Sequence, residues 1–261
     1  MRILITGAAR AIGRATADEL VARGHHVIAT ARNPELLSDF AGAAVLPLDV
    51  TDDASVTTCL AGAGPLDAIV NNAALDGSGP LEGYPVEQLR RVFETNTIGA
   101  FRMIQGVLPA WRERGSGVIV NVSSVQGRVS TPLTGAYAAS KFALEALSES
   151  LHYEAGHFGI RVVIIEPGYI APGMKHEGDH VGPAAYEELR AQWTGTDSRL
   201  NAAGRPGPDI VANAIAEAVV NPDTPLRVPV GADAELILAT RAQLNDTDFE
   251  ATMRATLDFT W

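Results

Sequence analysis

A phenol and an ammonium group stand four residues apart, at Tyr137 and Lys141, and Ser124 precedes the tyrosine by thirteen residues. Residues four apart are neighbours on one helix face. Moving a tyrosine pKa from about 10 to about 7 takes roughly 4 kcal/mol, and a cation at about 4 Å supplies about 1 kcal/mol in water but nearer 4 in a partly buried site. The spacing therefore predicts an acid/base pair if both side chains lie in a cleft. On an open surface they would be two ordinary helix residues.

A glycine-rich segment lies close to the N-terminus, between a short apolar stretch and a helical pattern. It reads Thr6-Gly7-Ala8-Ala9-Arg10-Ala11-Ile12-Gly13. Gly7 would permit a tight turn, Gly13 would permit close packing of helix on strand, and the helix N-terminus would offer N–H groups to a pyrophosphate. The glycine pattern alone is common, but its place between strand and helix favours a dinucleotide-binding turn.

Short apolar segments alternate with helical ones along the first two-thirds of the chain. Such alternation predicts an α/β fold, a doubly wound, mostly parallel sheet of Rossmann type with helices on both faces, formed by residues 1–261 as a single domain. Strands are predicted at 2–6, 26–30, 44–48, 66–71, 117–122, 161–166 and 226–230, and helices at 11–23, 53–61, 86–114, 137–157, 184–193 and 209–219.

The pattern loosens over residues 171–208, which are rich in glycine and proline. A long insertion in a compact domain is usually functional or disordered. We interpret this segment as a cover over a substrate, the alternative being a mobile surface loop.

Composition excludes several classes of function. The net charge of −11 argues against binding a nucleic-acid backbone. No apolar run approaches the roughly 18 residues of a membrane span, and nothing resembles a secretory signal. Cys59 is the only cysteine, so no intramolecular disulfide can form, which fits a cytoplasmic protein. The six histidines form no metal-ligand pattern with carboxylates, and His176 and His180 are interpreted as surface residues, so no metal is expected.

Several short motifs occur in one order along the chain: Thr6-Gly7…Gly13, Asp49-Val50, Asn71-Asn72-Ala73-Ala74, Asn96, Ser124, Tyr137…Lys141 and Pro167-Gly168. With these motifs the sequence resembles the short-chain dehydrogenase/reductase family, in its standard branch of about 250 residues. The resemblance covers nearly the whole chain. It implies an oxidoreductase that transfers hydride between a nicotinamide and a ketone, aldehyde or secondary alcohol.

The resemblance assigns roles to four catalytic residues. Tyr137 would act as the acid/base, and Ser124 would hold the carbonyl oxygen. Lys141 would lower the pKa of the tyrosine and bind the nicotinamide ribose, and Asn96 would hold a proton-relay water. A hydrolase built on Ser124 is excluded by the absence of a Gly-x-Ser-x-Gly elbow around it. A catalytically silent dinucleotide sensor on the same fold stays open as an alternative.

The tip of the second strand carries Arg32 where an NAD site usually has an acid, and Arg10 lies in the glycine turn. Two guanidinium groups can bind a 2′-phosphate, so we predict NADP(H), with NAD(H) and an NAD-linked alcohol dehydrogenase as the alternative. By resemblance, the cofactor would contact the glycine turn, the adenosine side, the catalytic pair and the turn after the sixth strand: Gly7, Arg10, Ile12, Gly13, Arg32, Asp49, Val50, Asn72, Ala73, Ala74, Tyr137, Lys141, Pro167, Gly168 and Ile170.

Three positions depart from the family pattern. Ala11 and Ala74 replace glycines, and Pro172 replaces a threonine that commonly helps hold the nicotinamide amide. We expect a helical φ at Ala11, because it should lie in the first helical turn.

Position beside the catalytic residues predicts Gln126, Tyr169 and Met174 as substrate contacts. The same reasoning adds pocket walls at Leu75, Asp76, Val129, Leu133 and Trp193. Mostly apolar walls favour an uncharged small-molecule carbonyl compound or alcohol. By resemblance, the helices at 86–114 and 137–157 would pair copies of the chain into a homodimer or homotetramer.

Overall fold

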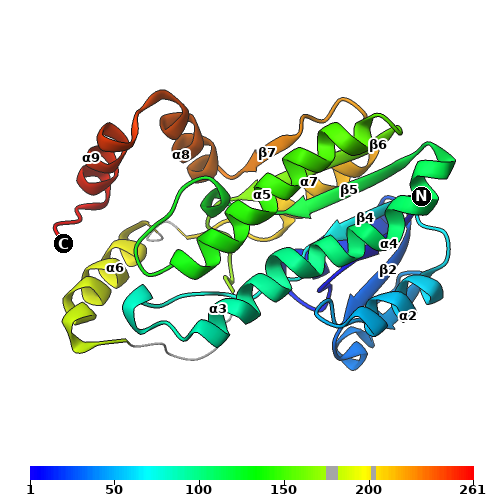
Figure 1. Ribbon diagram of the computed structural model, residues 1–261, viewed down its shortest axis with the longest axis horizontal. Helices are drawn as coiled ribbons and strands as arrows, with labels where there is room; N and C mark the ends of the chain where they lie inside the picture. The colour runs from blue at the N-terminus through cyan, green and yellow to red at the C-terminus, as the bar shows by residue number, and fades with distance from the viewer. Residues whose placement is uncertain (175–181, 201–203) are drawn as a thin grey trace.

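Seven parallel strands form one sheet in the order β3-β2-β1-β4-β5-β6-β7 in a computed structural model (Figure 1). The structure describes residues 1–174, 182–200 and 204–261, so His176 and His180 lie outside the described residues. The strands are β1 (Arg2–Ile5), β2 (His26–Ala31), β3 (Ala44–Pro47), β4 (Ala68–Asn71), β5 (Gly117–Val122), β6 (Ile160–Pro167) and β7 (Arg227–Val230). The predicted doubly wound parallel sheet is confirmed.

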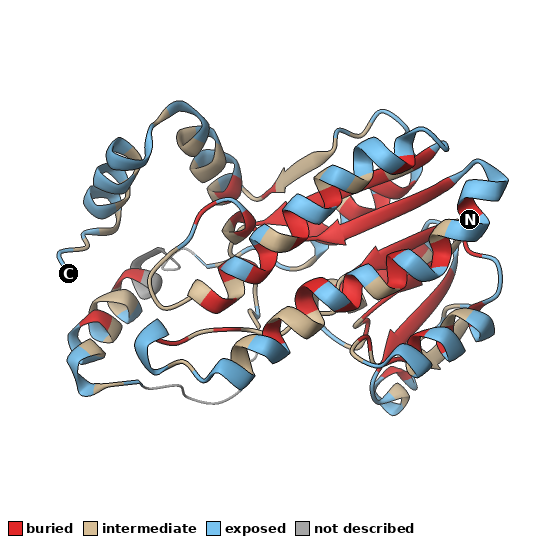
Figure 2. Cartoon of the chain, in the orientation of Figure 1, coloured by how far each residue is buried: buried red, intermediate tan, exposed pale blue. Residues whose placement is uncertain are grey.

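Helices cover both faces of this sheet. The α-helices are α1 (Ala11–Ala22), α2 (Asp53–Ala63), α3 (Val86–Phe93), α4 (Gly99–Arg114), α5 (Gly135–Gly156), α6 (Glu187–Leu200), α7 (Asp209–Val220), α8 (Ala232–Gln243) and α9 (Asp246–Leu257). Leu20 of α1 and Ile215 of α7 share one core cluster, and Cys59 of α2 and Met103 of α4 belong to the other. Figure 2 shows the central strands buried between these layers.

Side chains of the central strands alternate between the two cores. Ile3 and Ile5 of β1 point into the cluster with α1 and α7, whereas Leu4 points into the cluster with α2 and α4. All three are fully buried. Burying one such side chain stabilises the fold by about 1.5–3 kcal/mol, so strands apolar on both faces belong in the middle of the sheet.

The order of the strands reverses between β1 and β4, which are neighbours in the sheet although α1, β2, η1 (Pro34–Leu37), β3 and α2 lie between them in sequence. In open α/β sheets a crevice forms beyond the carboxyl ends of the strands at such a switch point. The glycine turn follows β1, and Asn72 follows β4. The fold therefore brings these segments to one edge of the sheet.

The predicted helix over 86–114 is interrupted by a π-helical turn, η3 (Glu94–Ile98), between α3 and α4. Asn96 lies in the middle of this turn and is buried. π-turns inside helices occur frequently at functional sites, because the wider turn changes the direction of a side chain. The spacing of apolar residues over 86–114 predicted one continuous helix and did not indicate the π-helical turn.

The prediction of a helical φ at Ala11 is wrong, because φ is +46°. Arg10 is extended, and the first hydrogen bond of α1 runs from Arg14 N to Arg10 O, so that bond leaves φ of Ala11 unconstrained. A left-handed residue lets the chain turn from Arg10 into the helix. Left-handed backbone at a residue with a Cβ costs about 1–2 kcal/mol.

We therefore expect Ala11→Gly to raise the free energy of unfolding by about 1 kcal/mol, because glycine adopts this φ without strain. Urea denaturation would measure it. Ala15→Gly is the matched control within α1 and should lower stability by about 1 kcal/mol. Equal destabilisation by both substitutions would contradict strain at Ala11.

Candidate active site

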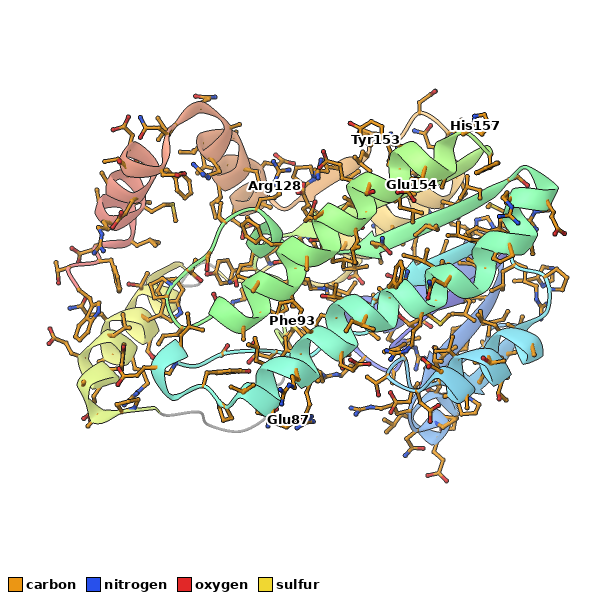
Figure 3. The ribbon with its side chains drawn as sticks, in the orientation of Figure 1. Glu87, Phe93, Arg128, Tyr153, Glu154 and His157 are labelled. Carbon is orange, nitrogen blue, oxygen red and sulfur yellow. The ribbon has the colours of Figure 1, made fainter. Side chains whose placement is uncertain are left out.

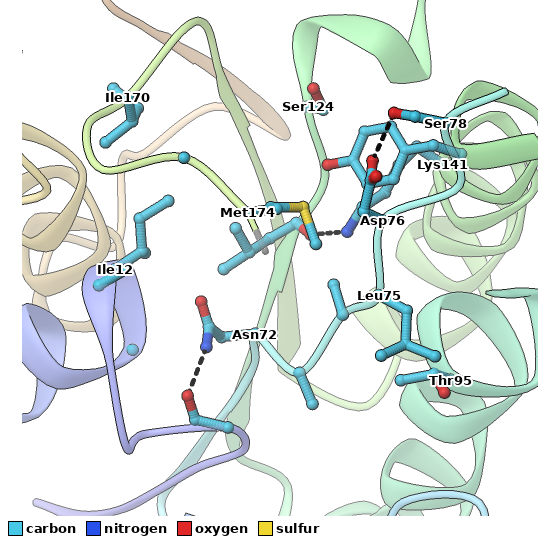
Figure 4. Close-up of a pocket in the computed structure, with 18 of the residues that line it drawn as sticks. Ile12, Asn72, Leu75, Asp76, Ser78, Thr95, Ser124, Lys141, Ile170 and Met174 are labelled. Carbon is cyan, nitrogen blue, oxygen red and sulfur yellow. Dashed lines mark hydrogen bonds between the residues drawn. The ribbon is translucent and has the colours of Figure 1, made fainter. Parts of the chain in front are cut away.

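A cavity of about 1230 Å³ opens at the carboxyl ends of the strands (Figure 4). Its walls include nearly every residue predicted from the sequence. They are Gly7, Arg10, Ile12, Gly13, Arg32, Asp49, Val50, Asn72, Ala73, Ala74, Leu75, Asp76, Ser124, Gln126, Leu133, Tyr137, Lys141, Pro167, Gly168, Tyr169, Ile170, Pro172, Met174 and Trp193. Residues spread over most of the chain thus meet at one site.

Val129 does not line this cavity, contrary to the prediction. It is buried in a separate apolar cluster with Ala234 of α8 and Phe249 of α9. The C-terminal helices, whose packing could not be predicted from the strand and helix pattern, cover it.

The side chain of Ser124 lies beside that of Tyr137, close enough to lower the pKa of the phenol. Ser124 precedes the 3₁₀ turn η4 (Val125–Gly127), and its Oγ accepts a hydrogen bond from Gln126 N at 3.1 Å. That bond fixes the hydroxyl beside the cavity. Tyr137 lies in the first turn of α5, so both hydroxyl groups can approach one oxygen atom of a substrate.

Lys141 follows Tyr137 by one turn of α5 and is buried. Its Nζ donates a hydrogen bond to Val122 O at 2.7 Å and lies 5.7 Å from the centroid of the Tyr137 ring. Burial lowers the pKa of Lys141 to about 8, and the charge of Glu145 opposes that shift. The carbonyl of β5 thus holds the ammonium group beside the ring of the tyrosine.

Burial raises the pKa of Tyr137 to about 12, although the adjacent Ser124 side chain lowers it, and the charge of Asp76 adds to the increase. With the chain's own groups alone, Lys141 does not lower the pKa of Tyr137 to near 7, because its ammonium group donates its hydrogen bond to Val122 O rather than to the phenol. Tyr137 is consequently a protonated phenol at neutral pH, which is the form that donates a proton.

Asn96 does not line the cavity, because its amide is buried behind Leu75. Its Oδ1 accepts from Leu75 N at 2.7 Å, and its Nδ2 donates to Leu75 O at 2.9 Å and to Ser140 Oγ at 3.0 Å. The π-turn directs this amide toward α5. Asn96 therefore fixes a wall of the cavity against α5, and the water-relay role stays a prediction.

Asn96→Ala should lower the free energy of unfolding by about 1–3 kcal/mol, because Leu75 N and Leu75 O lose their partner in a buried place. Urea denaturation would measure the change. Asn213→Ala is the control: Asn213 is exposed on α7 and, among the described residues, accepts only from Arg23, so a change within about 0.5 kcal/mol is expected. Equal effects of the two substitutions would contradict the conclusion that the hydrogen bonds of Asn96 hold the Leu75 backbone in place.

The glycine turn forms a cradle in which a side chain would not fit. Gly7 has a φ of +66°, and a Cβ at Gly13 would lie 2.3 Å from Gly7 O. Asn72 Nδ2 donates to Thr6 O at 3.0 Å and to Gly7 O at 3.1 Å. Because the N-terminal residues of α1 line the cavity, this cradle suits a pyrophosphate.

Arg10 and Arg32 lie exposed at the rim of the cavity. Neither forms an ion pair with a described residue, whereas nearby Arg14 is paired with Asp18 and Asp39. Two such guanidinium groups near one rim suit a phosphate.

Asp49 lies beside Arg32 and is not a helix cap. The N-cap of α2 is Asp52, whose carboxylate accepts from Ala54 N. Burial favours a higher pKa for Asp49, but hydrogen bonds from Thr51 N (2.9 Å) and Thr51 Oγ1 (2.7 Å), with the charge of Arg32, lower it overall. Asp49 is thus an ionised carboxylate at the cavity wall.

Asp233 is a positioning residue that sequence reasoning missed. Its Oδ2 accepts from Tyr169 N at 2.7 Å, and a Cβ at Gly168 would lie 2.2 Å from the same oxygen. The carboxylate, in the first turn of α8, therefore holds the turn that follows β6. The sequence signal that could have pointed to Asp233 is its position, because it is an acidic residue two positions after Gly231, which follows the end of β7.

The cavity has more charged walls than the sequence predicted. Arg91, Arg190 and Arg205 line it, and the Arg205 guanidinium lies 5.2 Å from the centroid of the Tyr169 ring. Among the described residues there is no cluster of three metal-ligating side chains. No helix within the described ranges is long and apolar enough to cross a membrane.

The family model for short chain dehydrogenases matches residues 1–180. The chain is 35% identical over 242 residues to the uncharacterized oxidoreductase YbbO of Escherichia coli K12, covering 87% of this chain and 84% of that protein. A short-chain dehydrogenase structure from Streptomyces avermitilis is 36% identical with a TM-score of 0.78, each chain being 98% covered. One from Burkholderia cenocepacia, in complex with NADP, is 26% identical with a TM-score of 0.77 over 98% of this chain and 96% of that one. This chain belongs to the short-chain dehydrogenase family and is an oxidoreductase.

Proposed function

We propose that the protein is an NADP(H)-dependent oxidoreductase that interconverts a ketone or aldehyde and the corresponding alcohol. The observation that carries this proposal is the placement of Ser124 beside Tyr137 on one cavity, with buried Lys141 one turn further along α5. This acid group opens onto the same cavity as the glycine cradle. A cavity with both features suits hydride transfer to a carbonyl carbon.

The residues that would hold the dinucleotide are those of the cradle and its rim. The pyrophosphate would lie at the N-terminus of α1, and the 2′-phosphate between Arg10 and Arg32. Asp49 and Val50 would face the adenine, and Lys141 the nicotinamide ribose. When bound, the nicotinamide supplies or accepts the hydride.

The chain's own groups would act on the carbonyl oxygen. Ser124 Oγ–H and the Tyr137 hydroxyl donate hydrogen bonds to this oxygen and polarise the C=O bond. As negative charge develops there, the phenol proton passes to the oxygen and an alcohol leaves. The ammonium of Lys141 stabilises the phenolate that remains. Positioned proton transfer of this kind contributes roughly 10²–10⁴-fold in rate.

We assign the substrate side of the cavity to Gln126, Tyr169 and Met174. Described residues of the predicted cover at 171–208 line the cavity, among them Pro172, Met174 and Trp193 of α6. Leu75, Leu133 and Met174 give it apolar surface, which favours an uncharged substrate of moderate size.

A homodimer or homotetramer paired through α4 and α5 is part of the proposal. Their outer faces expose large apolar side chains, among them Phe101 at 40%, Phe142 at 44% and Tyr153 at 74%. Figure 3 shows Tyr153 projecting from α5. Light scattering of the wild type and of Phe101→Glu/Phe142→Glu would test the pairing, with a monomeric wild type contradicting it.

The test of the proposed function is NADPH consumption with a panel of uncharged and carboxylate-bearing ketones and aldehydes. Turnover of uncharged members is expected. Tight NADPH binding without turnover of any member would favour the silent sensor.

A further inference from the structure

Two glutamate side chains are buried directly behind the catalytic residues and take no part in the steps above. Glu145 follows Lys141 by one turn of α5 and is 4% exposed, and Glu166 lies near the end of β6 and is 1% exposed. A buried carboxylate without a full set of partners is costly, so a pair of them in one place requires an explanation.

The two carboxylates meet at one arginine. Arg227 Nε lies 2.9 Å from Glu145 Oε2 and 3.9 Å from Glu166 Oε1. The other Glu145 oxygen, Oε1, has no hydrogen-bond partner among the described residues, and neither does Glu166 Oε1. Both carboxylates therefore keep oxygens for which the described part of the chain supplies no donor.

The pair also lies against the turn that carries Ser124. A Cβ at Gly127 of η4 would lie 2.5 Å from Ser123 Oγ and 3.2 Å from Glu145 Oε1. Ser123 Oγ is likewise buried without a described partner. Glu145 thus packs beneath η4 on one side and adjoins Lys141 on the other.

The charges around the pair leave one negative charge in excess. The acids are Glu145 and Glu166, together with exposed Glu149, whose Oε2 lies 2.5 Å from Arg227 Nη2. The guanidinium groups are Arg227 of β7 and Arg128, whose Nη1 lies 3.6 Å from Glu166 Oε1. Three carboxylates thus face two guanidinium groups.

Two further charged groups of the packed elements, Lys141 and Asp233, carry opposite charges and leave this balance unchanged. The ammonium of Lys141 is bonded to Val122 O, and Asp233 of α8 is bonded to Tyr169 N. One proton on the buried pair balances the cluster and supplies the missing donor for a bare carboxylate oxygen.

We propose that Glu145 and Glu166 form a buried acid pair that holds one proton, and that the negative charge kept on Glu145 supports the cationic form of Lys141. Both are positioning residues, because they act through Lys141 and through the turn carrying Ser124. Burial and the charge of Glu145 raise the pKa of Glu166 to about 7, against the opposing charges of Arg128 and Arg227, which agrees with a proton held on Glu166. The part that concerns Lys141 rests on the proposed function.

The shared proton is tested without any activity measurement, by the melting temperature of wild type and Glu166→Gln between pH 5 and pH 8. Because the folded state holds the Glu166 proton more tightly than the unfolded state, wild-type stability from this group is lost as pH rises from the ordinary glutamate pKa to about 7. Glutamine carries no such penalty. We expect the difference in melting temperature, variant minus wild type, to increase by about 4 °C across this range. A difference independent of pH would overturn the shared proton.

The support of Lys141 is tested by the pH profile of kcat/KM for carbonyl reduction. Without the charge of Glu145, the ammonium of Lys141 should lose its proton at lower pH, so Glu145→Gln should shift the alkaline limb down by roughly one pH unit. Glu145→Asp should restore part of the shift. A uniform loss of rate at every pH would overturn the coupling.

Glu149→Gln is the matched control, because it removes an exposed carboxylate from the same arginine. It should move neither the pH-dependent stability difference nor the alkaline limb, and an equal response in either measurement would overturn the specific role of the buried pair. If the wild type reduces no carbonyl compound, the proposed function fails, while the melting-temperature series still decides whether the pair shares a proton.

Discussion

Replacing Tyr137 with phenylalanine should lower kcat/KM for carbonyl reduction by roughly 10²–10⁴-fold and leave the Kd for NADPH within about threefold of the wild type. The variant keeps the ring and loses the proton that Tyr137 would transfer to the substrate oxygen. Ser124 would still donate a hydrogen bond, so a residual rate is expected. Steady-state kinetics with fluorescence titration of NADPH would measure both quantities.

Tyr153→Phe is the matched control for this substitution. Tyr153 is on the same helix and 74% exposed, away from the cavity. Its removal should leave kcat/KM unchanged. If Tyr137→Phe keeps a rate within threefold of the wild type, Tyr137 is not the proton donor.

Replacing Arg32 with alanine should weaken NADPH binding by roughly 10–100-fold and leave NADH binding unchanged. The 2′-phosphate of NADPH would lose charge-assisted hydrogen bonds from the Arg32 guanidinium, which are worth about 1.5–3 kcal/mol. NADH has no such phosphate, so its binding should not change. Arg10→Ala should act in the same direction, and the double variant should bind the two cofactors about equally. Isothermal titration with NADPH and NADH would measure these constants.

Arg90→Ala serves as the control, since Arg90 is exposed on α3 and pairs only with Glu87 among the described residues. It should change neither Kd. A loss of NADH affinity equal to the loss of NADPH affinity in Arg32→Ala would show that the arginine does not discriminate the phosphate.

The sheet and the cavity walls could be predicted from the sequence because their signals are local. Buried strands are short runs of apolar residues, as in Ile3-Leu4-Ile5, and the glycine turn needs residues without a Cβ at Gly7 and Gly13. Parallel strands end at one edge of the sheet, so residues that follow different strands must meet there. These rules place Ser124 and Asn72 at one site without any knowledge of their contacts.

Other features depend on contacts between distant segments. Asp233 reaches the turn after β6 only because α8 follows β7 at the sheet edge, and Val129 is covered by α8 and α9 rather than by the cavity. The positive φ of Ala11 arises from how the turn enters α1, and a residue type does not reveal it. Glu145 of α5 and Glu166 of β6 meet at Arg227, whereas each glutamate alone in the sequence would be expected to be an exposed charge.

The same distinction applies to the acid/base pair. The spacing of Tyr137 and Lys141 predicted their shared helix face, but neither the burial of the ammonium group nor the acceptor of its hydrogen bond. Val122 O takes that bond, and burial then dominates the pKa of the phenol. Spacing alone cannot predict such a balance, because it depends on which carbonyl lies beneath the lysine.

The most direct test of hydride transfer is the fate of deuterium placed at both hydrogen positions of C4 of the reduced nicotinamide of NADPH. With a carbonyl substrate found in the panel, mass spectrometry of the wild-type product should show one deuterium on the carbinol carbon, and Tyr137→Phe should form this product far more slowly. An alcohol product without deuterium, or tight NADPH binding with no labelled product from any carbonyl compound, would contradict hydride transfer as the function of this site.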